Sequence, residues 1–116
     1  MVRVYLDTNV FIQAFEASEA IARPVQDLLQ AFSAMPGAAV TSELTLAELL
    51  APTKQANELP FNQRESLYGD LLLWSGTIDT RPVGRGILLG TAGLRRQISL
   101  KLADAIHVMT AIDSSL

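Results

Sequence analysis

The sequence predicts an α/β fold in which a mainly parallel sheet carries helices on its faces. Short apolar segments typical of buried strands alternate with longer segments whose apolar residues recur every three or four positions. Strands that alternate with helices in this way usually lie parallel in one sheet. The 116 residues suffice for one domain and are too few for two, and 49% of them are hydrophobic, so they can fill a core. We expect a single domain over residues 1–116.

The first strand and the first two helices are predicted near the N-terminus. Residues 2–6 (VRVYL) are the strand candidate, and Thr8 or Asn9 can cap a short helix through Phe15. The next helix has Pro24 in its predicted first turn, and apolar residues follow it at helical spacing. A Pro-Gly step then ends this helix.

Two further strand candidates, residues 38–41 and 77–80, divide the middle of the chain. A helix is expected over residues 45–50. Another is expected to open at Asn62, whose spacing to Glu65 resembles a capping box.

The last two predicted helices cover residues 83–98 and the segment LKLADAIHVMTAI at residues 100–112. Four glycines weaken the prediction for the earlier helix: Gly84, Gly86, Gly90 and Gly93. Their spacing is not that of a dinucleotide-binding loop, so we attribute them to close helix packing.

Composition excludes several classes of protein. There is no cysteine, so the chain has neither a disulfide framework nor a thiolate metal site. No stretch reaches the ~18 consecutive apolar residues of a membrane span. The N-terminus lacks the apolar core of a signal peptide. We therefore expect a soluble cytoplasmic domain.

The charge pattern leaves two interpretations open. A net charge of −3 argues mildly against a protein that coats nucleic acid. Five of the nine basic residues nevertheless fall in a stretch without acidic residues: Arg81, Arg85, Arg95, Arg96 and Lys101. They form either a solvated helix face or a rim that attracts phosphates beside an acidic centre.

Two carboxylates have both a structural and a functional interpretation. Asp7 directly follows the first strand, where ligands bind in open α/β sheets, but it could equally cap the next helix. Glu48 has capping-box spacing to Thr45, which favours a structural role. If the helix instead starts at Ser42, Glu48 lies inside it, one turn after Thr45 on the same face.

Asp104 is the hardest carboxylate to explain structurally, because apolar residues flank it in a helix that looks suited to burial. A buried, unpaired carboxylate costs several kcal/mol. A neutral His107 could donate a hydrogen bond to Asp104, or it could be a satisfied core histidine. We favour a structural role for His107, since a hard-cation site prefers oxygen ligands.

The fold class can bring Asp7, Glu48 and Asp104 to one edge of the sheet. Two carboxylates ~4–5 Å apart repel by roughly 3–4 kcal/mol at an effective dielectric constant of about 20, so three of them together need a cation. Oxygen donors without cysteine suit Mg²⁺ or Mn²⁺. A metal ion held between carboxylates activates water for hydrolysis of a phosphodiester.

Three segments, LDTNVF, SELTLAELL and LADAIHVMTA, resemble the PIN-domain nucleases, and within them the VapC-type toxin ribonucleases. The resemblance implies a PIN-like three-layer α/β/α sandwich and RNA cleavage that depends on Mg²⁺ or Mn²⁺. It also implies homodimers and inhibition by a small antitoxin protein. It assigns metal-binding, catalytic roles to Asp7, Glu48 and Asp104, with Asn9 and Ser42 as supporting polar residues.

One departure from the resemblance leaves alternatives open. The family usually continues with another strand and a fourth acidic or hydroxyl residue, whereas this sequence ends at Leu116, so we expect the C-terminal strand to be missing. Asp113 cannot substitute on one unbroken helix, because it lies ~13 Å further along the axis than Asp104. The chain could therefore be a truncated domain that binds protein or RNA without catalysis. A phosphatase with Asp7 as nucleophile ranks last, because Asn9 stands where a second Asp belongs.

Overall fold

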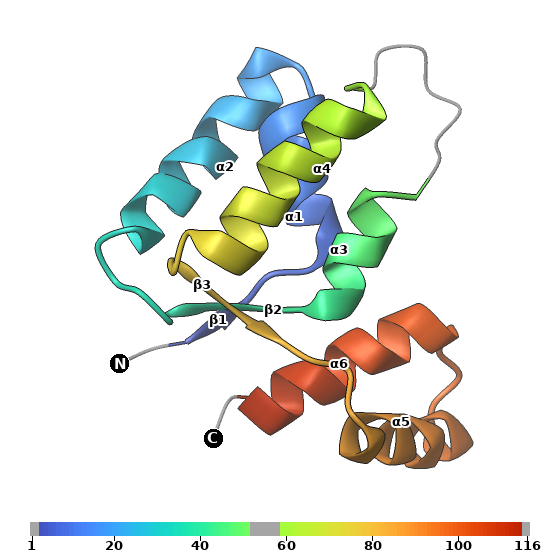
Figure 1. Cartoon of the computed structure of the whole chain (residues 1–116). Helices are drawn as coiled ribbons and strands as arrows, with labels where there is room; N and C mark the ends of the chain where they lie inside the picture. The colour runs from blue at the N-terminus through green and yellow to red at the C-terminus, as the bar shows by residue number, and fades with distance from the viewer. Residues whose placement is uncertain (1–2, 52–58, 115–116) are drawn as a thin grey trace.

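A parallel sheet of three strands lies at the centre of the protein, in a computed structural model that describes residues 3–51 and 59–114. The strands are β1 (Val4–Tyr5), β2 (Ala39–Ser42) and β3 (Ile78–Arg81), side by side in that order (Figure 1). β2 is the middle strand, and all four of its residues are buried.

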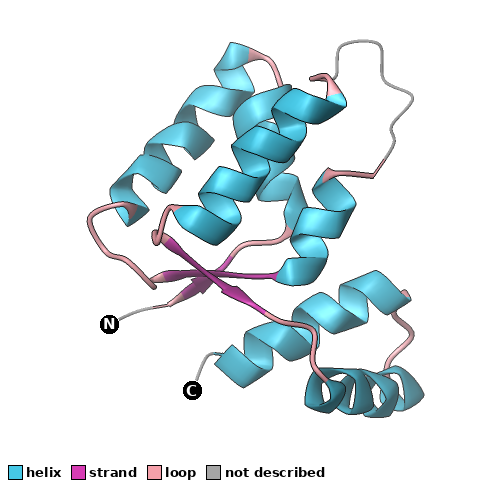
Figure 2. Ribbon diagram, in the orientation of Figure 1, coloured by secondary structure: helices cyan, strands magenta, loops and turns pink. Residues whose placement is uncertain are grey.

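Helices lie on both faces of this sheet, as Figure 2 shows. The upper face carries α1 (Thr8–Glu16), α2 (Glu19–Phe32), α3 (Glu43–Leu49) and α4 (Phe61–Gly69), which continues as a π-helical turn, η1 (Asp70–Trp74). On the lower face α6 (Leu102–Ser114) packs against β2, and α5 (Arg85–Gln97) packs on α6. The predicted three-layer α/β/α fold with a parallel sheet is confirmed. None of the helices in the described residues is long and apolar enough to cross a membrane.

The main hydrophobic core lies between the sheet and the upper helices. Phe11 from α1 and Tyr68 from α4 are fully buried there, together with Ala39 of the middle strand. The segments that alternate in the sequence therefore meet in one apolar layer, and its burial is the main force that holds the upper helices on the sheet.

Two predicted helix starts are wrong, although the helices themselves exist. The N-cap of α1 is Asp7 rather than Thr8 or Asn9, both of which already have helical geometry. Pro24 lies inside α2, because that helix begins at Glu19, more than one turn earlier than the proline suggested.

The predicted capping box between Asn62 and Glu65 is also wrong. The N-cap of α4 is Pro60, which has no side-chain donor or acceptor to offer. Asn62 instead lies in the first turn, where its Oδ1 accepts a hydrogen bond from the backbone N–H of Gln63. The start of this helix depends on the proline, whose backbone is already extended at that point.

Close helix packing explains one of the four glycines of the 83–98 segment. A Cβ atom on Gly90 would come within 2.5 Å of Met109 Cε on α6. By contrast, a Cβ on Gly84, Gly86 or Gly93 would meet nothing within 4 Å. Of these four glycines, only Gly90 is packed against α6, and the atom that its Cβ would meet is the flexible end of the Met109 side chain.

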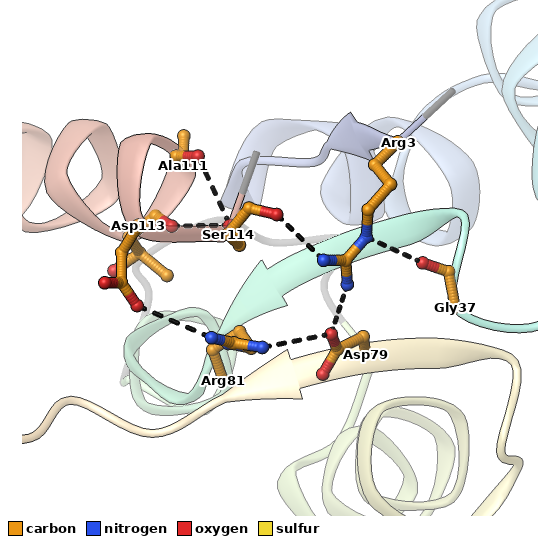
Figure 3. Close-up of polar contacts among 8 residues, drawn as sticks. Arg3, Gly37, Asp79, Arg81, Ala111, Asp113 and Ser114 are labelled. Atoms are coloured by element: carbon orange, nitrogen blue, oxygen red, sulfur yellow. Dashed lines mark hydrogen bonds and ion pairs between the residues drawn. The ribbon is translucent and has the colours of Figure 1, made fainter. Parts of the chain in front are cut away.

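Arg3 connects the start of β1 to the lower helix layer (Figure 3). Its guanidinium donates to the backbone carbonyls of Gly37 and Ser114, at 3.3 and 2.8 Å, and forms an ion pair with Asp79 of β3. Asp79 also pairs with Arg81, which in turn pairs with Asp113 at 3.4 Å. This network ties β1, β3 and the end of α6 together.

We predict that Arg3→Met lowers the free energy of unfolding by about 1–2 kcal/mol, because two backbone carbonyls lose a charged donor and Asp79 loses a cation. Arg23→Met is the matched control, since among the described residues Arg23 pairs only with Glu19, on an exposed helix face. Its effect should stay within about 0.5 kcal/mol. Urea denaturation of both variants measures the difference, and equal effects would contradict a structural role for Arg3.

Tyr68 links the buried core to a carboxylate at the end of α1. Its hydroxyl donates to Glu16 Oε2 at 2.6 Å. Burial, followed by the hydrogen bond and the negative charge of Glu16, raises the pKa of Tyr68 above its ordinary value of 10. The folded state therefore keeps a proton that the unfolded state releases more easily.

The free energy of unfolding should accordingly fall as the pH rises above about 10, where the unfolded chain loses the tyrosine proton and the folded chain still binds it. Tyr68→Phe has no such proton and should show a smaller fall. Urea denaturation at about pH 9 and about pH 11 measures this. An identical fall in the variant would show that Tyr68 is not a source of the alkaline destabilisation.

Candidate functional site

A polar cavity of about 270 Å³ opens beyond the carboxyl end of β1, among α1, α3 and α6. Its lining consists of Asp7, Thr8, Asn9, Ile12, Glu48, Asp104 and His107. A neighbouring cavity of about 270 Å³ shares Asp7, Asp104 and His107 and runs alongside Tyr5. The three carboxylates and the asparagine singled out in the sequence therefore lie around one cavity.

Asp7 reaches the cavity because of its place just after β1. The preceding Leu6 is buried, and its carbonyl accepts a hydrogen bond from the hydroxyl of Thr41 on β2 at 2.7 Å. Asp7 then ends the extended segment as the N-cap of α1, but its side chain makes no capping hydrogen bond. The capping interpretation thus describes its backbone and leaves its exposed carboxylate available to a ligand.

Glu48 reaches the cavity from α3, which starts at Glu43 with Ser42 as its N-cap. The Thr45–Glu48 capping box is therefore wrong, because Glu48 lies within the helix. Its Oε1 accepts two hydrogen bonds, from Thr8 Oγ1 at 2.7 Å and from His107 Nε2 at 2.6 Å. The half-buried carboxylate is thus held from both sides of the sheet.

Ser42 does not line the cavity. It is fully buried at the end of β2, and its Oγ accepts a hydrogen bond from the backbone N–H of Leu44 at 3.0 Å. The serine therefore acts on the site indirectly, by fixing where α3 begins and hence where Glu48 lies.

Asp104 lies in the first turn of α6 and is exposed, so the expectation of a buried carboxylate is wrong. The helix buries one side only, that of Ala105, Ile106 and His107, while Val108 on the other side is 39% exposed. Because apolar residues flank Asp104 on both sides in the sequence, the sequence did not show that one face of the helix is exposed. The carboxylate faces the cavity without a hydrogen bond or ion pair to any described residue.

The sequence left open a hydrogen bond from His107 to Asp104. In the structure His107 bonds to Glu48 instead. Its second nitrogen, Nδ1, lies 2.6 Å from the hydroxyl of Tyr5. Burial raises the pKa of Tyr5 to about 12; a hydrogen bond with Thr110 opposes the shift, and the negative charges of Asp7 and Glu48 add to it. Tyr5 and Thr8 were not predicted as the hydrogen-bond partners of His107 and Glu48. Their closeness to Asp7 in the sequence was the one feature that could have indicated them.

The residue types around the cavity fit a hard divalent cation, because carboxylate, amide and hydroxyl groups all supply oxygen donors. Their arrangement fits less closely. Within residues 3–51 and 59–114, no three acidic or histidine side chains stand close enough to hold a metal ion together. The side chains of Asp7 and Asp104 are exposed and make no hydrogen bond to another described residue, so both are free to turn toward a ligand in the cavity.

A larger cavity of about 520 Å³ lies at the end of β3, but its charges are already paired. Asp79 and Asp113 line it and both pair with Arg81, and Asp79 also pairs with Arg3. α6 runs unbroken from Asp104 to Asp113, and Asp113 lies in this second cavity rather than beside Asp104. The polar cavity at β1 is therefore the better candidate site.

The basic stretch of the sequence is only partly available to a ligand. Arg81 is engaged with two carboxylates, and the side chain of Arg95 donates to the carbonyl of Leu100. Arg85, Arg96 and Lys101 are exposed on α5 and just before α6. Both interpretations of the stretch, a solvated face and a phosphate-attracting rim, stay compatible with this arrangement.

The fold and the site agree with one comparison to known proteins. The PIN domain family, whose members are generally nucleases, matches residues 4–116. No curated protein and no solved structure matches the chain. Because the match covers nearly the whole sequence, from β1 to the end of α6, the chain belongs to the PIN domain family.

Proposed function

We propose that this protein is an endoribonuclease that hydrolyses RNA phosphodiester bonds with the help of Mg²⁺ or Mn²⁺. The observation that carries the proposal is the meeting of Asp7, Glu48 and Asp104 around one cavity, although they are far apart in the sequence. Membership of a family of nucleases supports the same activity.

In this proposal the three carboxylates hold the cation, and each contributes in a different way. Glu48 is fixed by its two hydrogen bonds, whereas the exposed Asp7 and Asp104 would supply the other carboxylate ligands. A cation held there would supply Lewis acidity, which lowers the pKa of a bound water molecule and offsets negative charge on a phosphate. Asn9, exposed at the cavity, orients Asp7 or the attacking water, and Ser42 keeps α3 in register.

Exposed basic residues that precede Asp104 in the sequence support an RNA substrate. Lys101 directly precedes the helix that carries Asp104, and Arg96 lies in the last turn of α5. Neither forms an ion pair with a described residue. We propose that these side chains attract RNA phosphates toward the acidic cavity, where the cation offsets the carboxylate charge.

We further propose that the protein is the toxin of a type II toxin–antitoxin pair, active in the cytoplasm as a homodimer and inhibited by a small antitoxin protein. The likeness of the segments around Asp7, Glu48 and Asp104 to VapC-type toxins supports this role. A gene for a small protein directly beside that of this chain, and neutralisation of toxicity by its product, would test it.

The nuclease activity is tested by cleavage of a structured RNA pool in Mg²⁺, in Mn²⁺ and in EDTA. We expect cleavage that requires the cation. Asp104→Asn should lower the rate by at least about 100-fold, since even groups that only support metal ligands commonly change activity 10–100-fold. Asp113→Asn is the matched control, because it makes the same change on the same helix at the other cavity, and it should retain the wild-type rate.

The second candidate function is a domain that binds RNA or protein without catalysis. The spacing of the acidic side chains favours it, since no three of them in the described residues stand close enough together to hold a metal ion. A folded protein that binds the RNA pool but leaves it intact in both metals would support this alternative. Equal cleavage by the wild type and Asp104→Asn would contradict the assigned site.

A further inference from the structure

Among the described residues, the Glu48 carboxylate accepts hydrogen bonds on one oxygen only. Oε1 accepts hydrogen bonds from Thr8 Oγ1 at 2.7 Å and from His107 Nε2 at 2.6 Å. No hydrogen bond reaches Oε2 from the residues that the structure describes. A carboxylate with one oxygen bound from two directions has little freedom to rotate, and its other oxygen keeps its lone pairs for a ligand.

Both nitrogens of His107 are occupied. Nε2 faces Glu48 Oε1, and Nδ1 lies 2.6 Å from the hydroxyl of Tyr5. His107 is also buried, at 9% exposure, and the ring of Tyr5 packs edge-on against it at 5.8 Å between centroids. The imidazole therefore has no free lone pair with which to bind a metal ion itself.

The chemistry of the partners selects one form of the ring. A carboxylate only accepts hydrogen bonds, so Nε2 must carry a proton in order to bond Glu48. A tyrosine hydroxyl keeps its proton at neutral pH and can donate it to a bare Nδ1. The chain of donors then runs in one direction, from Tyr5 through His107 to Glu48.

We infer that Tyr5 and His107 are positioning residues that orient Glu48, so that its Oε2 is presented to a cation in the cavity. The inference rests on the proposed function for the identity of the ligand. Residues that hydrogen-bond to a metal ligand commonly fix its orientation. Here His107 is the hydrogen-bond donor and the Glu48 carboxylate is the ligand that it orients.

The first test observes the ring directly, without metal and without activity. His107 is the only histidine in the chain, so its two ring nitrogens give the only histidine signals in a long-range ¹H–¹⁵N NMR spectrum of labelled protein. We expect a proton on Nε2, the nitrogen that faces the Glu48 carboxylate. A ring whose Nε2 carries no proton would overturn the inference, because a bare Nε2 cannot donate to Glu48.

Tyr5→Phe tests the outer link, with Tyr68→Phe as its matched control. Each change removes one tyrosine hydroxyl from a 2.6 Å hydrogen bond, but Tyr68 bonds to Glu16 away from the cavity. Tyr5→Phe should shift the Nδ1 resonance and leave Nε2 protonated, whereas the control should change neither. An unchanged Nδ1 resonance in Tyr5→Phe would remove Tyr5 from the chain of donors.

The second test measures the dissociation constant of Mn²⁺ alone by calorimetry. His107→Ala should weaken Mn²⁺ binding by roughly 10–100-fold, because Glu48 loses a donor that orients it. His107→Gln offers an amide N–H toward Oε1 and should recover most of the affinity. Wild-type affinity in a folded His107→Ala protein, checked by circular dichroism, would overturn the inference.

Two outcomes separate this inference from the proposed function. If His107→Ala does not fold, His107→Leu replaces it as the variant without a donor, and wild-type Mn²⁺ affinity in that folded variant would overturn the inference. If the wild-type protein binds no Mn²⁺, the proposed nuclease loses its cation. The NMR result then decides on its own whether the chain of donors to Glu48 exists.

Discussion

The candidate site depends on the pair of hydrogen bonds that end on one oxygen of Glu48. Thr8 at the start of α1 lies on the upper side of the sheet with α3, and His107 comes from α6 on the lower side. The carboxylate therefore joins two layers that the apolar core alone does not connect, since that core lies between the sheet and the upper helices. The position of Glu48 is therefore coupled to that of α6, which is also held by its packing on β2 and by the hydrogen bond from Arg3 to Ser114.

The parallel sheet makes this meeting possible. β1 pairs in parallel with β2, so both strands end at the same edge, and α1 and α3 begin there with Asp7 and Ser42 as their N-caps. The chain then crosses to the other face after β3, and α6 returns beneath β2. The carboxyl edge of an open α/β sheet is the usual place for a ligand, because several chain segments begin a new element there.

Sequence patterns predicted the fold class, the order of strands and helices, and the three carboxylates that reach the cavity. These features depend on local periodicity and on which residues follow strands, which a sequence shows directly. Exposure of Asp104 could not be predicted in the same way. Apolar residues surround it in sequence, but only one side of α6 packs on the sheet and on α5.

The hydrogen-bond partners of the site residues could not be predicted from the sequence either. Tyr5 and His107 lie 102 residues apart, and no spacing rule relates them. Helix starts were misplaced for a related reason: several residues in a row could serve as N-cap, and the tertiary position of the strand end decides among them. Asp7, one residue before the two predicted caps, ends β1's extended segment and so takes that role.

The central claim is that one cation is shared by Asp7, Glu48 and Asp104, and it is tested most directly by a crystal structure of the protein soaked in Mn²⁺. Anomalous scattering identifies the metal position without reference to activity. The account predicts a peak in the polar cavity, bound by Asp7, Asp104 and Glu48 Oε2, with His107 still bonded to Oε1. A peak bound to His107, or one found only outside this cavity, would contradict it.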